Sequence, residues 1–213
     1  MNQATIIIFA KAPEPGKVKT RLTTELSQVQ AAELHERLVL YTLEWISKVV
    51  NKFDHIKAEL WCAPSKQHAF FAHCEQRFPV VLLEQQGDNL GDRMFHAIEQ
   101  VLGHSKQAII VGTDCPFLTE QNITDCIDQL NNGGECVIIP AKDGGYVMLG
   151  ANKVDAQLFT NIAWGDDTVF TETSRRLNDL GWSWQTQKSL NDIDRPTDLA
   201  LLEEITLPPT TSS

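Results

Sequence analysis

Basic residues are scarce in this chain of 213 residues, which has 18 Lys and Arg against 28 Asp and Glu and a net charge of −10. An acidic surface argues against nonspecific binding to nucleic acid or to an anionic membrane surface. Because basic side chains are few, the four that gather at Lys11, Lys17, Lys19 and Arg21 carry more information than they would in a basic protein.

The chain also lacks any apolar run near the roughly 20 residues that a membrane-spanning helix needs. Its five cysteines are widely spaced and include no Cys-x-x-Cys pair, a pattern that favours reduced thiols over a disulfide framework or a zinc site. No basic stretch with a short apolar core, as in a signal peptide, opens the sequence. We therefore expect a cytoplasmic protein without a membrane span.

Strand-like apolar runs alternate with amphipathic segments along the chain, which indicates a mostly parallel sheet with helices on both faces. The strands expected at 136–140 and 146–150 are separated by a turn too short for a parallel crossover, so we expect one antiparallel strand. Composition and length favour a single domain over residues 1–205, followed by a flexible tail over 206–213. The other expected strands cover 5–10, 56–62, 80–83, 107–112 and 182–187. Helices capped by Ser27, Thr119 and Thr168 are expected, as are a helix from Ser65 to about Phe78 and a final helix with Pro196 in its first turn.

Ligands in an open α/β sheet bind beyond the carboxyl ends of the strands, so the loops after strands are the first candidates for a site. The loop 11–21 follows the first strand and carries the four basic residues, whose ammonium and guanidinium groups suit phosphate oxygens. It is not a Walker loop, because the upstream glycine and the Ser or Thr after the lysine are missing. The alternative is a solvated basic loop.

Acidic side chains follow later strands. Asp114 comes directly after the strand 107–112, in Gly112-Thr-Asp-Cys-Pro, where a carboxylate is held rigidly yet stays open to a ligand, as Mg²⁺ or Mn²⁺ requires. Asp192 and Asp194 lie two residues apart, so an extended backbone would point both carboxylates the same way. Alternatively, Asp114 caps its turn and Asp194 stabilises a helix N-terminus.

Two further loops are candidates for substrate contacts. Asp143-Gly-Gly-Tyr146 contains glycines that let backbone approach a sugar or acceptor, although a hairpin turn needs the same residues. Trp164 opens a loop, Trp-Gly-Asp-Asp, that leads into a helix, whereas most other tryptophans are expected in the core. No Gly-x-Ser-x-Gly elbow and no His-Glu-x-x-His zinc helix is present.

In order, these motifs resemble the bacterial family often called DUF2064, which contains glycosyltransferase-like proteins of the nucleotide-diphospho-sugar transferase (GT-A) fold. The fold is also similar to that of the molybdenum-cofactor and 2-phospholactate guanylyltransferases. The resemblance covers residues 5 to 203 and implies a three-layer α/β/α sandwich with a mixed, mostly parallel seven-stranded sheet containing one antiparallel strand. It rests on the segments FAKAPEPGKVKTRL (9–22), GTDCP (112–116), DGGY (143–146), WGDD (164–167) and DIDRPTDL (192–199).

The resemblance also implies roles. Asp114 and Asp192 match the metal ligands of the fold, and with Asp194 they are our candidate ligands for Mg²⁺ or Mn²⁺. Lys19 and Arg21 would stabilise phosphate charge as catalytic residues, and Asp143 would orient or deprotonate an acceptor hydroxyl. The expected nucleotide and substrate contacts are Ala10, Lys11, Lys17, Gly91, Arg93, Thr113, Gly144, Gly145, Tyr146 and Trp164.

The leading functional hypothesis is a metal-dependent glycosyltransferase that uses a nucleoside diphosphate sugar and a small-molecule acceptor. The alternative is guanylyltransferase-like transfer of a nucleotide from a nucleoside triphosphate to a small phosphorylated acceptor, with release of pyrophosphate. The basic loop after the first strand slightly favours this alternative. A third hypothesis, a nucleotide-binding scaffold, does not explain why Asp114, Asp192, Lys19 and Arg21 converge. The nucleobase, the sugar, the acceptor and the oligomeric state stay open.

Overall fold

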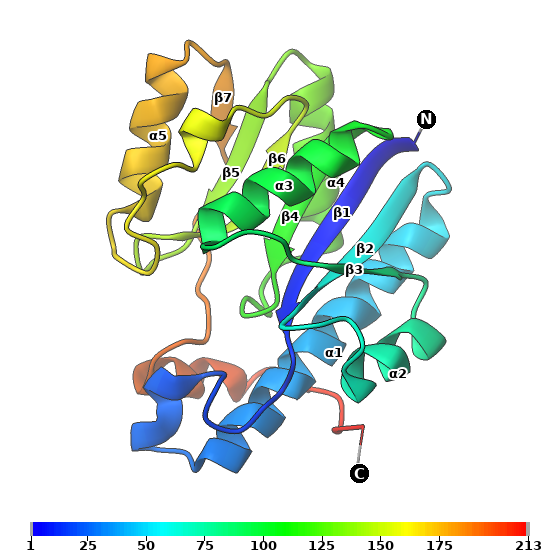
Figure 1. Cartoon of the computed structure of the whole chain (residues 1–213), viewed down its shortest axis with the longest axis vertical. Coiled ribbons are helices and arrows are strands. Elements are labelled where there is room, and N and C mark those ends of the chain that lie inside the picture. Colours follow the sequence, from blue (N-terminus) through cyan, green and yellow to red (C-terminus); the bar gives the residue numbers. More distant parts are fainter. Residues whose placement is uncertain (1, 212–213) are drawn as a thin grey trace.

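The computed structural model describes residues 2–211 and arranges them as a sheet between two layers of helices (Figure 1). The strands are β1 Asn2–Lys11, β2 Ile56–Ala63, β3 Val81–Glu84, β4 Ser105–Gly112, β5 Cys136–Pro140, β6 Tyr146–Ala151 and β7 Trp184–Thr186. The α-helices are α1 Gln28–Lys52, α2 Ala69–Arg77, α3 Leu90–Leu102, α4 Glu120–Asn131 and α5 Val169–Asp179. Three 3-10 helices are η1 Thr20–Thr24, η2 Ala156–Leu158 and η3 Pro196–Leu202.

The seven strands form one sheet in the order β3-β2-β1-β4-β6-β5-β7. Only β6 runs antiparallel, to both β4 and β5, and the other neighbouring pairs are parallel. The short turn between β5 and β6 forces this reversal, because a parallel return would need a long crossover. The predicted mixed sheet with one antiparallel strand is confirmed.

Both faces of the sheet are buried, which explains the continuous apolar runs in the central strands. In β1, Ile6 and Ile8 pack towards α1, α2 and α4, whereas Ile7 packs towards α3 and α5. Helix α3 crosses the near face of the sheet in Figure 1. The two faces therefore hold separate apolar cores, as a three-layer sandwich requires.

Strand order reverses between β1 and β4, since β2 and β3 lie on one side of this pair and β6, β5 and β7 on the other. Ligands of open α/β sheets bind in the crevice beyond the carboxyl ends of the strands at such a point. Strand β1 ends at Lys11 and β4 ends at Gly112. The fold therefore brings the basic loop and the loop of Asp114 to the same crevice.

Two expected helices differ in the structure. The helix expected from Ser65 begins at Ala69, because the His68 side chain accepts the cap hydrogen bond from Phe70 N while the Ser65 hydroxyl donates to Glu84 at 2.7 Å. The helix expected after Pro196 is the 3-10 helix η3.

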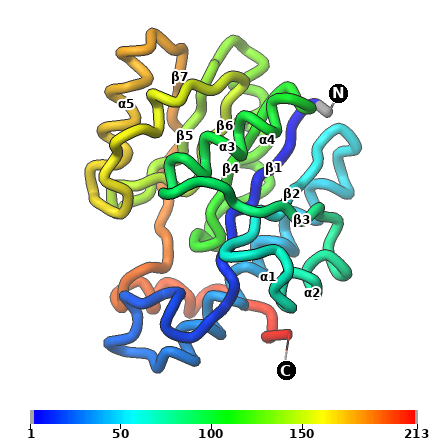
Figure 2. The backbone as a smooth tube through the Cα atoms, viewed as in Figure 1, coloured from blue at the N-terminus to red at the C-terminus, as the bar shows by residue number. Residues whose placement is uncertain are grey.

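The C-terminal segment packs back against the start of the chain. Figure 2 shows η3 beside η1, and the segment after it returns along α1. Leu207 is buried with Leu38 and Ile193, and Arg37 Nε donates to the Pro208 carbonyl at 2.9 Å. The described part of the predicted flexible tail, 206–211, thus lies against α1. No helix within residues 2–211 is long and apolar enough to span a bilayer.

Candidate active site

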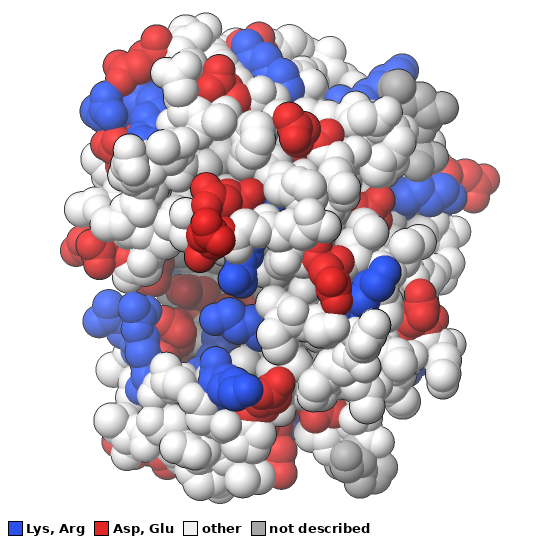
Figure 3. All heavy atoms as spheres, viewed as in Figure 1, with Lys and Arg blue, Asp and Glu red and all other residues white. Residues whose placement is uncertain are grey.

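A cleft with a volume of about 540 Å³ opens at the carboxyl ends of β1 and β4. Figure 3 shows it as a hollow flanked by basic side chains with acidic side chains inside. The loop after β1, the loop after β4 and the segment 192–194 surround it, so the fold joins parts of the sequence that lie far apart. The expected residues that line it are Ala10, Lys11, Lys17, Lys19, Arg21, Thr113, Asp114, Tyr146, Asp192 and Asp194.

Lys19 lines the cleft, but its side chain is almost completely buried. Its side chain is only 2% exposed, and its backbone has a φ of 49°, a left-handed conformation that is uncommon outside glycine. The Nζ atom lies 2.9 Å from Asp114 Oδ1 and donates to the Ile193 carbonyl at 2.5 Å. Its ammonium group therefore contacts protein oxygens from two separate loops.

The segment 192–194 is anchored by its middle residue. Ile193 is completely buried between α1 and the C-terminal segment, and its N–H donates to the Asp114 carbonyl at 2.8 Å. Ile193 is buried, whereas the aspartates on either side of it both line the cleft. This anchor places Asp192 beside the loop of Asp114.

The carboxylates of the cleft have different electrostatic environments. The pKa of Asp192 is raised to about 6, first by burial and then by repulsion from the carboxylates of Asp143, Asp114 and Asp194. For Asp114 burial acts in the same direction, but the nearby ammonium groups, above all that of Lys19, outweigh it and lower the pKa. Asp192 thus carries a negative charge that the protein leaves poorly compensated.

These carboxylates fit a hard cation in part. Asp194 accepts a hydrogen bond from Arg21 Nη1 at 2.5 Å, so this expected ligand is already paired. Within residues 2–211, no three His, Cys, Asp or Glu side chains form a ready metal site. Asp114 contacts Lys19 through Oδ1 and its side chain is 45% exposed, so it remains a candidate ligand together with Asp192. Mg²⁺ is commonly held by one or two carboxylates plus substrate phosphates. The donor set therefore suits a cation whose coordination is completed by a substrate.

The basic loop offers less free positive charge than its sequence indicates. Lys17 forms an ion pair with Glu14 at 2.5 Å, and Arg21 bridges Asp194 to the Gly165 carbonyl. The hydrogen bond to Asp194 raises the pKa of the Arg21 guanidinium. For Lys11, which lines the cleft, no ion pair is found in the described part of the chain.

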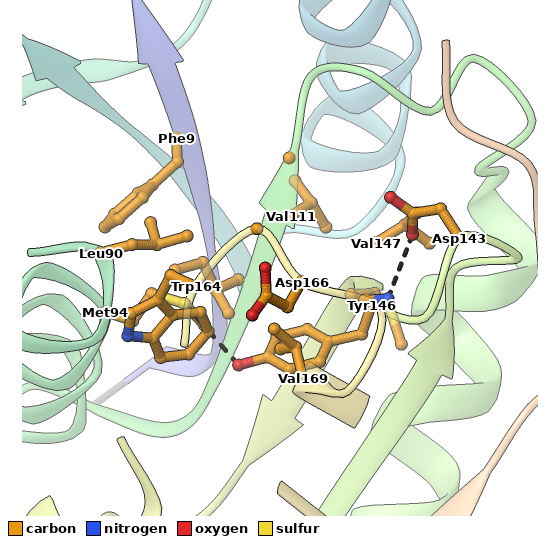
Figure 4. Close-up of a pocket in the computed structure, with 15 residues that line it drawn as sticks. Phe9, Leu90, Met94, Val111, Asp143, Tyr146, Val147, Trp164, Asp166 and Val169 are labelled. Atoms are coloured by element: carbon orange, nitrogen blue, oxygen red, sulfur yellow. Dashed lines mark hydrogen bonds between the residues drawn. The ribbon is translucent and has the colours of Figure 1, made fainter. Parts of the chain in front are cut away.

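A smaller recess of about 200 Å³ adjoins the cleft on the β4–β6 side. Figure 4 shows Phe9, Leu90, Met94 and Trp164 gathered on one side of it and Asp143 on the other. Among the residues that the structure describes, no Lys, Arg or His lines this recess. Of the expected contacts it contains Asp143, Gly145, Tyr146 and Trp164.

Two expected nucleotide contacts lie elsewhere. A Cβ on Gly91 would come within 2.7 Å of Trp164 Nε1 and 2.6 Å of the Phe159 carbonyl, so this buried glycine makes room for the indole. Arg93 Nε donates to the Gly87 carbonyl at 3.0 Å and thereby closes its own loop. Neither residue lines the cleft or the recess.

Gly144 also makes room for the Trp164 loop. Its φ is 99°, and a Cβ at this position would collide with the Asp167 backbone. Its carbonyl accepts a hydrogen bond from Phe170 N at 2.8 Å. Gly144 therefore fixes the start of α5 rather than lining the cleft.

Sequence reasoning missed several lining residues. His35 lies on the buried face of α1, its Nε2 is 3.0 Å from the Lys11 carbonyl, and burial lowers its pKa. With Nε2 as the donor, the neutral ring turns Nδ1 towards Asp114 Oδ1, 3.9 Å away. A polar residue in the apolar stripe of α1 was the available signal. Gln85, Leu90 and Met94 had no comparable signal, because only the fold brings them to the cleft or recess.

Replacing Lys19 by methionine is expected to lower the free energy of unfolding by about 1–3 kcal/mol. Removing one partner of a buried ion pair costs about 3–5 kcal/mol, and the exposure of Asp114 reduces that figure. Urea denaturation measures the loss. The matched control is Lys17→Met, whose side chain is 71% exposed and whose stability should stay within about 0.5 kcal/mol of wild type. Equal stability of the two variants would contradict the role given to Lys19.

Replacing Gly91 by alanine is expected to move the Trp164 ring, because the added methyl group has no space beside it. The cost is about 1–3 kcal/mol, as for other overpacked sites. The fluorescence of Gly91→Ala is compared with that of the double variant Gly91→Ala, Trp164→Phe. The difference isolates the signal of the Trp164 ring. An unchanged Trp164 signal with unchanged stability would show that the contact is not tight.

The sequence profile of the family described as "Uncharacterized protein conserved in bacteria (DUF2064)" matches residues 46–166, more than half of the chain. The chain belongs to the DUF2064 family. The matched region runs from within α1 to the Trp164 loop and includes Asp114, Asp143 and Tyr146. No curated protein matches the sequence.

Solved structures confirm the nucleotide-diphospho-sugar transferase fold for this DUF2064 chain. A protein from Desulfovibrio desulfuricans G20, provisionally described as a nucleotide-diphospho-sugar transferase, is 24% identical, with a TM-score of 0.82 over 97% of this chain and 90% of the other. A cytidylyltransferase from Leptospira borgpetersenii is 11% identical, with a TM-score of 0.62 over 95% and 86%. The 4-diphosphocytidyl-2C-methyl-D-erythritol synthase of Anaerococcus prevotii is 13% identical, with a TM-score of 0.61 over 94% of each chain.

Proposed function

We propose that this DUF2064 protein is a nucleotide-binding transferase that moves a sugar from a nucleoside diphosphate sugar to an uncharged acceptor, with the help of Mg²⁺ or Mn²⁺. The choice of sugar transfer over nucleotide transfer rests on one observation. The cleft of Asp114 and Asp192 opens directly into a recess whose described lining contains no Lys, Arg or His. Such a wall suits a neutral acceptor and gives a second phosphate no counter-charge.

The donor binds in the cleft with its diphosphate at the carboxyl ends of β1 and β4. Asp114 and Asp192 would hold the divalent cation, which would supply positive charge to the departing diphosphate. Lys19 keeps Asp114 and the Ile193 segment in place, and Lys11 supplies a positive side chain at the cleft wall. This division of roles differs from our expectation, in which Lys19 itself faced the phosphates.

The acceptor hydroxyl is oriented by Asp143, whose Oδ1 is fixed by the Gly145 N–H at 3.1 Å. The hydroxyl oxygen forms a bond to the anomeric carbon of the donor, and the bond from that carbon to the phosphate oxygen breaks. The hydroxyl proton passes to the Asp143 carboxylate, and the nucleoside diphosphate leaves with the electron pair. Asp143 is suited to this role because it lines both the recess and a hollow that includes Asp192.

One observation favours the alternative, nucleotidyl transfer to a phosphorylated acceptor. Lys142 and Arg195 line a hollow of about 360 Å³ together with Asp143 and Asp192, and a phosphate could bind there. The same hollow also contains Asp167, Asp194 and Asp198, so acidic side chains outnumber the two basic ones. Together with the ion pairs of the basic loop, this balance makes glycosyl transfer the better-supported reaction.

The test is a panel of nucleoside triphosphates, diphosphates and nucleoside diphosphate sugars, each with Mn²⁺ and with a chelator. Thermal shift identifies ligands that bind, since about a hundredfold excess over Kd stabilises the fold by roughly 2.7 kcal/mol. Product analysis then decides the reaction. We expect stabilisation by one diphosphate and its sugar, with slow release of that diphosphate. Pyrophosphate release from a triphosphate would contradict glycosyl transfer and support the alternative.

A further inference from the structure

We infer that the recess beside the cleft binds an apolar ring of the acceptor, an inference that rests on the proposed function. The acceptor substrates are then neutral alcohols that carry one ring-sized apolar group. The recess holds about 200 Å³ and is walled by Phe9, Leu90, Met94 and Trp164. Leu90 is 43% exposed, which leaves part of the apolar wall open to water and available to a ligand.

The Trp164 wall is built before any ligand arrives. Gly91 and Gly144 each lack the Cβ that would collide with this loop, and Arg21 Nη2 donates to the Gly165 carbonyl at 3.3 Å. The segment that leads into the loop is held by Arg176, which donates to the carbonyls of Gln157, Thr160 and Asn161. A wall fixed from both sides loses little entropy when a ring packs on it, which favours binding.

The chemistry of the recess excludes other occupants. The Tyr146 hydroxyl is directed at Met94 Sδ, 3.8 Å away, and burial raises its pKa, so it stays neutral. The remaining titratable side chains of the recess are the carboxylates of Asp143 and Asp166, which repel phosphates and other anions. A bare sugar would leave most of its hydroxyl groups without partners against this wall.

A nucleobase fits better on the other side of the cleft. Gln85 follows β3 and lines the cleft but not the recess, and its side-chain amide lies beside the Ala10 and Trp61 carbonyls. Polar groups of this kind recognise the edge of a base, whereas the side chains of the recess offer apolar surface, two carboxylates and a Tyr146 hydroxyl that is directed at Met94. Its volume matches one ring, because a cavity of about 150 Å³ binds benzene.

The experiment uses benzyl alcohol, benzyl phosphate and glycerol as probes on the full chain, with binding followed by NMR titration. We expect benzyl alcohol to bind and the other two to bind at least about tenfold more weakly. Trp164→Ala should weaken benzyl alcohol at least fivefold, since one aromatic contact is worth about that factor. Trp164→Phe should restore binding to within threefold, which separates a lost ring contact from a misfolded protein. The matched control is Trp184→Phe, in β7 away from the cleft.

Nucleotide binding is measured separately by thermal shift with Mn²⁺. It distinguishes a failure of the ring-binding inference from a failure of the proposed function. Benzyl alcohol that still binds at a saturating nucleoside diphosphate supports the inference. Displacement of benzyl alcohol by the nucleotide would show that the recess holds the base and would overturn it. Nucleotide binding without benzyl alcohol binding, or an unchanged affinity in Trp164→Ala, would also overturn it and leave the proposed function standing. Failure of both ligands would overturn the proposed function as well.

Discussion

Asp114→Asn is expected to lower the affinity for the nucleotide in the presence of Mn²⁺ by about a hundredfold, the larger end of what loss of a residue that only supports a metal ligand costs. The physical reason is that Asp194 is paired with Arg21, whereas Asp114 contacts Lys19 through Oδ1 only and can offer its other oxygen, with Asp192, to a cation. Isothermal titration of the nucleotide selected by the panel, with Mn²⁺ and with a chelator, measures the loss.

The titration in a chelator shows whether the loss of nucleotide affinity depends on the metal. Without metal, Asp114→Asn should bind the nucleotide as wild type does, or slightly better, because one negative charge near the phosphates is gone. Asp128→Asn, on the exposed face of α4, is the control and should match wild type in both arms. An Asp114→Asn protein that keeps its metal-dependent affinity would remove Asp114 from the proposed site.

Asp192→Asn is expected to make the metal-free protein more stable while weakening metal-dependent binding at least tenfold. Burial and the repulsion from Asp143 raise the pKa of Asp192 from 3.8 to about 6, which corresponds to at most about 3 kcal/mol. Partial exposure of the side chain reduces this to about 1–2 kcal/mol, or roughly 2–8 °C in Tm for a domain of this size. Thermal unfolding in a chelator measures the gain.

The pH dependence of this gain follows from its origin. Because the folded pKa is raised, the ionised carboxylate destabilises the fold above about pH 6, and the penalty disappears below the unfolded value of 3.8. The Tm difference between Asp192→Asn and wild type should therefore be largest at neutral pH and vanish near pH 4. A constant difference, or a less stable variant at neutral pH, would contradict the electrostatic account.

The architecture was predictable because its signals are local. Continuous apolar strands, capped helices and the short turn before Tyr146 each predict their own element, and together they determine a mixed sheet with one antiparallel strand. Asp114 was recognisable for the same reason, as a carboxylate directly after a buried strand. Such features need no knowledge of distant contacts.

The partners of the site residues were not predictable, because they come from distant parts of the chain. Lys19 reaches Ile193 across 174 positions, and Arg21 reaches Asp194 across 173. A sequence shows that lysines and arginines gather in a loop, but not that three of them are already paired with carboxylates. Gly91 shows the same limit, since only the fold reveals that Trp164 covers it.

The central claim is that Asp114 and Asp192 together hold one divalent cation against nucleotide phosphates. Electron paramagnetic resonance of Mn²⁺, titrated into the protein at a saturating nucleoside diphosphate, tests it most directly. We expect one bound Mn²⁺ per chain in wild type, at least tenfold weaker binding in Asp114→Asn and in Asp192→Asn, and no change in Asp128→Asn. Equal Mn²⁺ binding in wild type and both cleft variants would contradict the account.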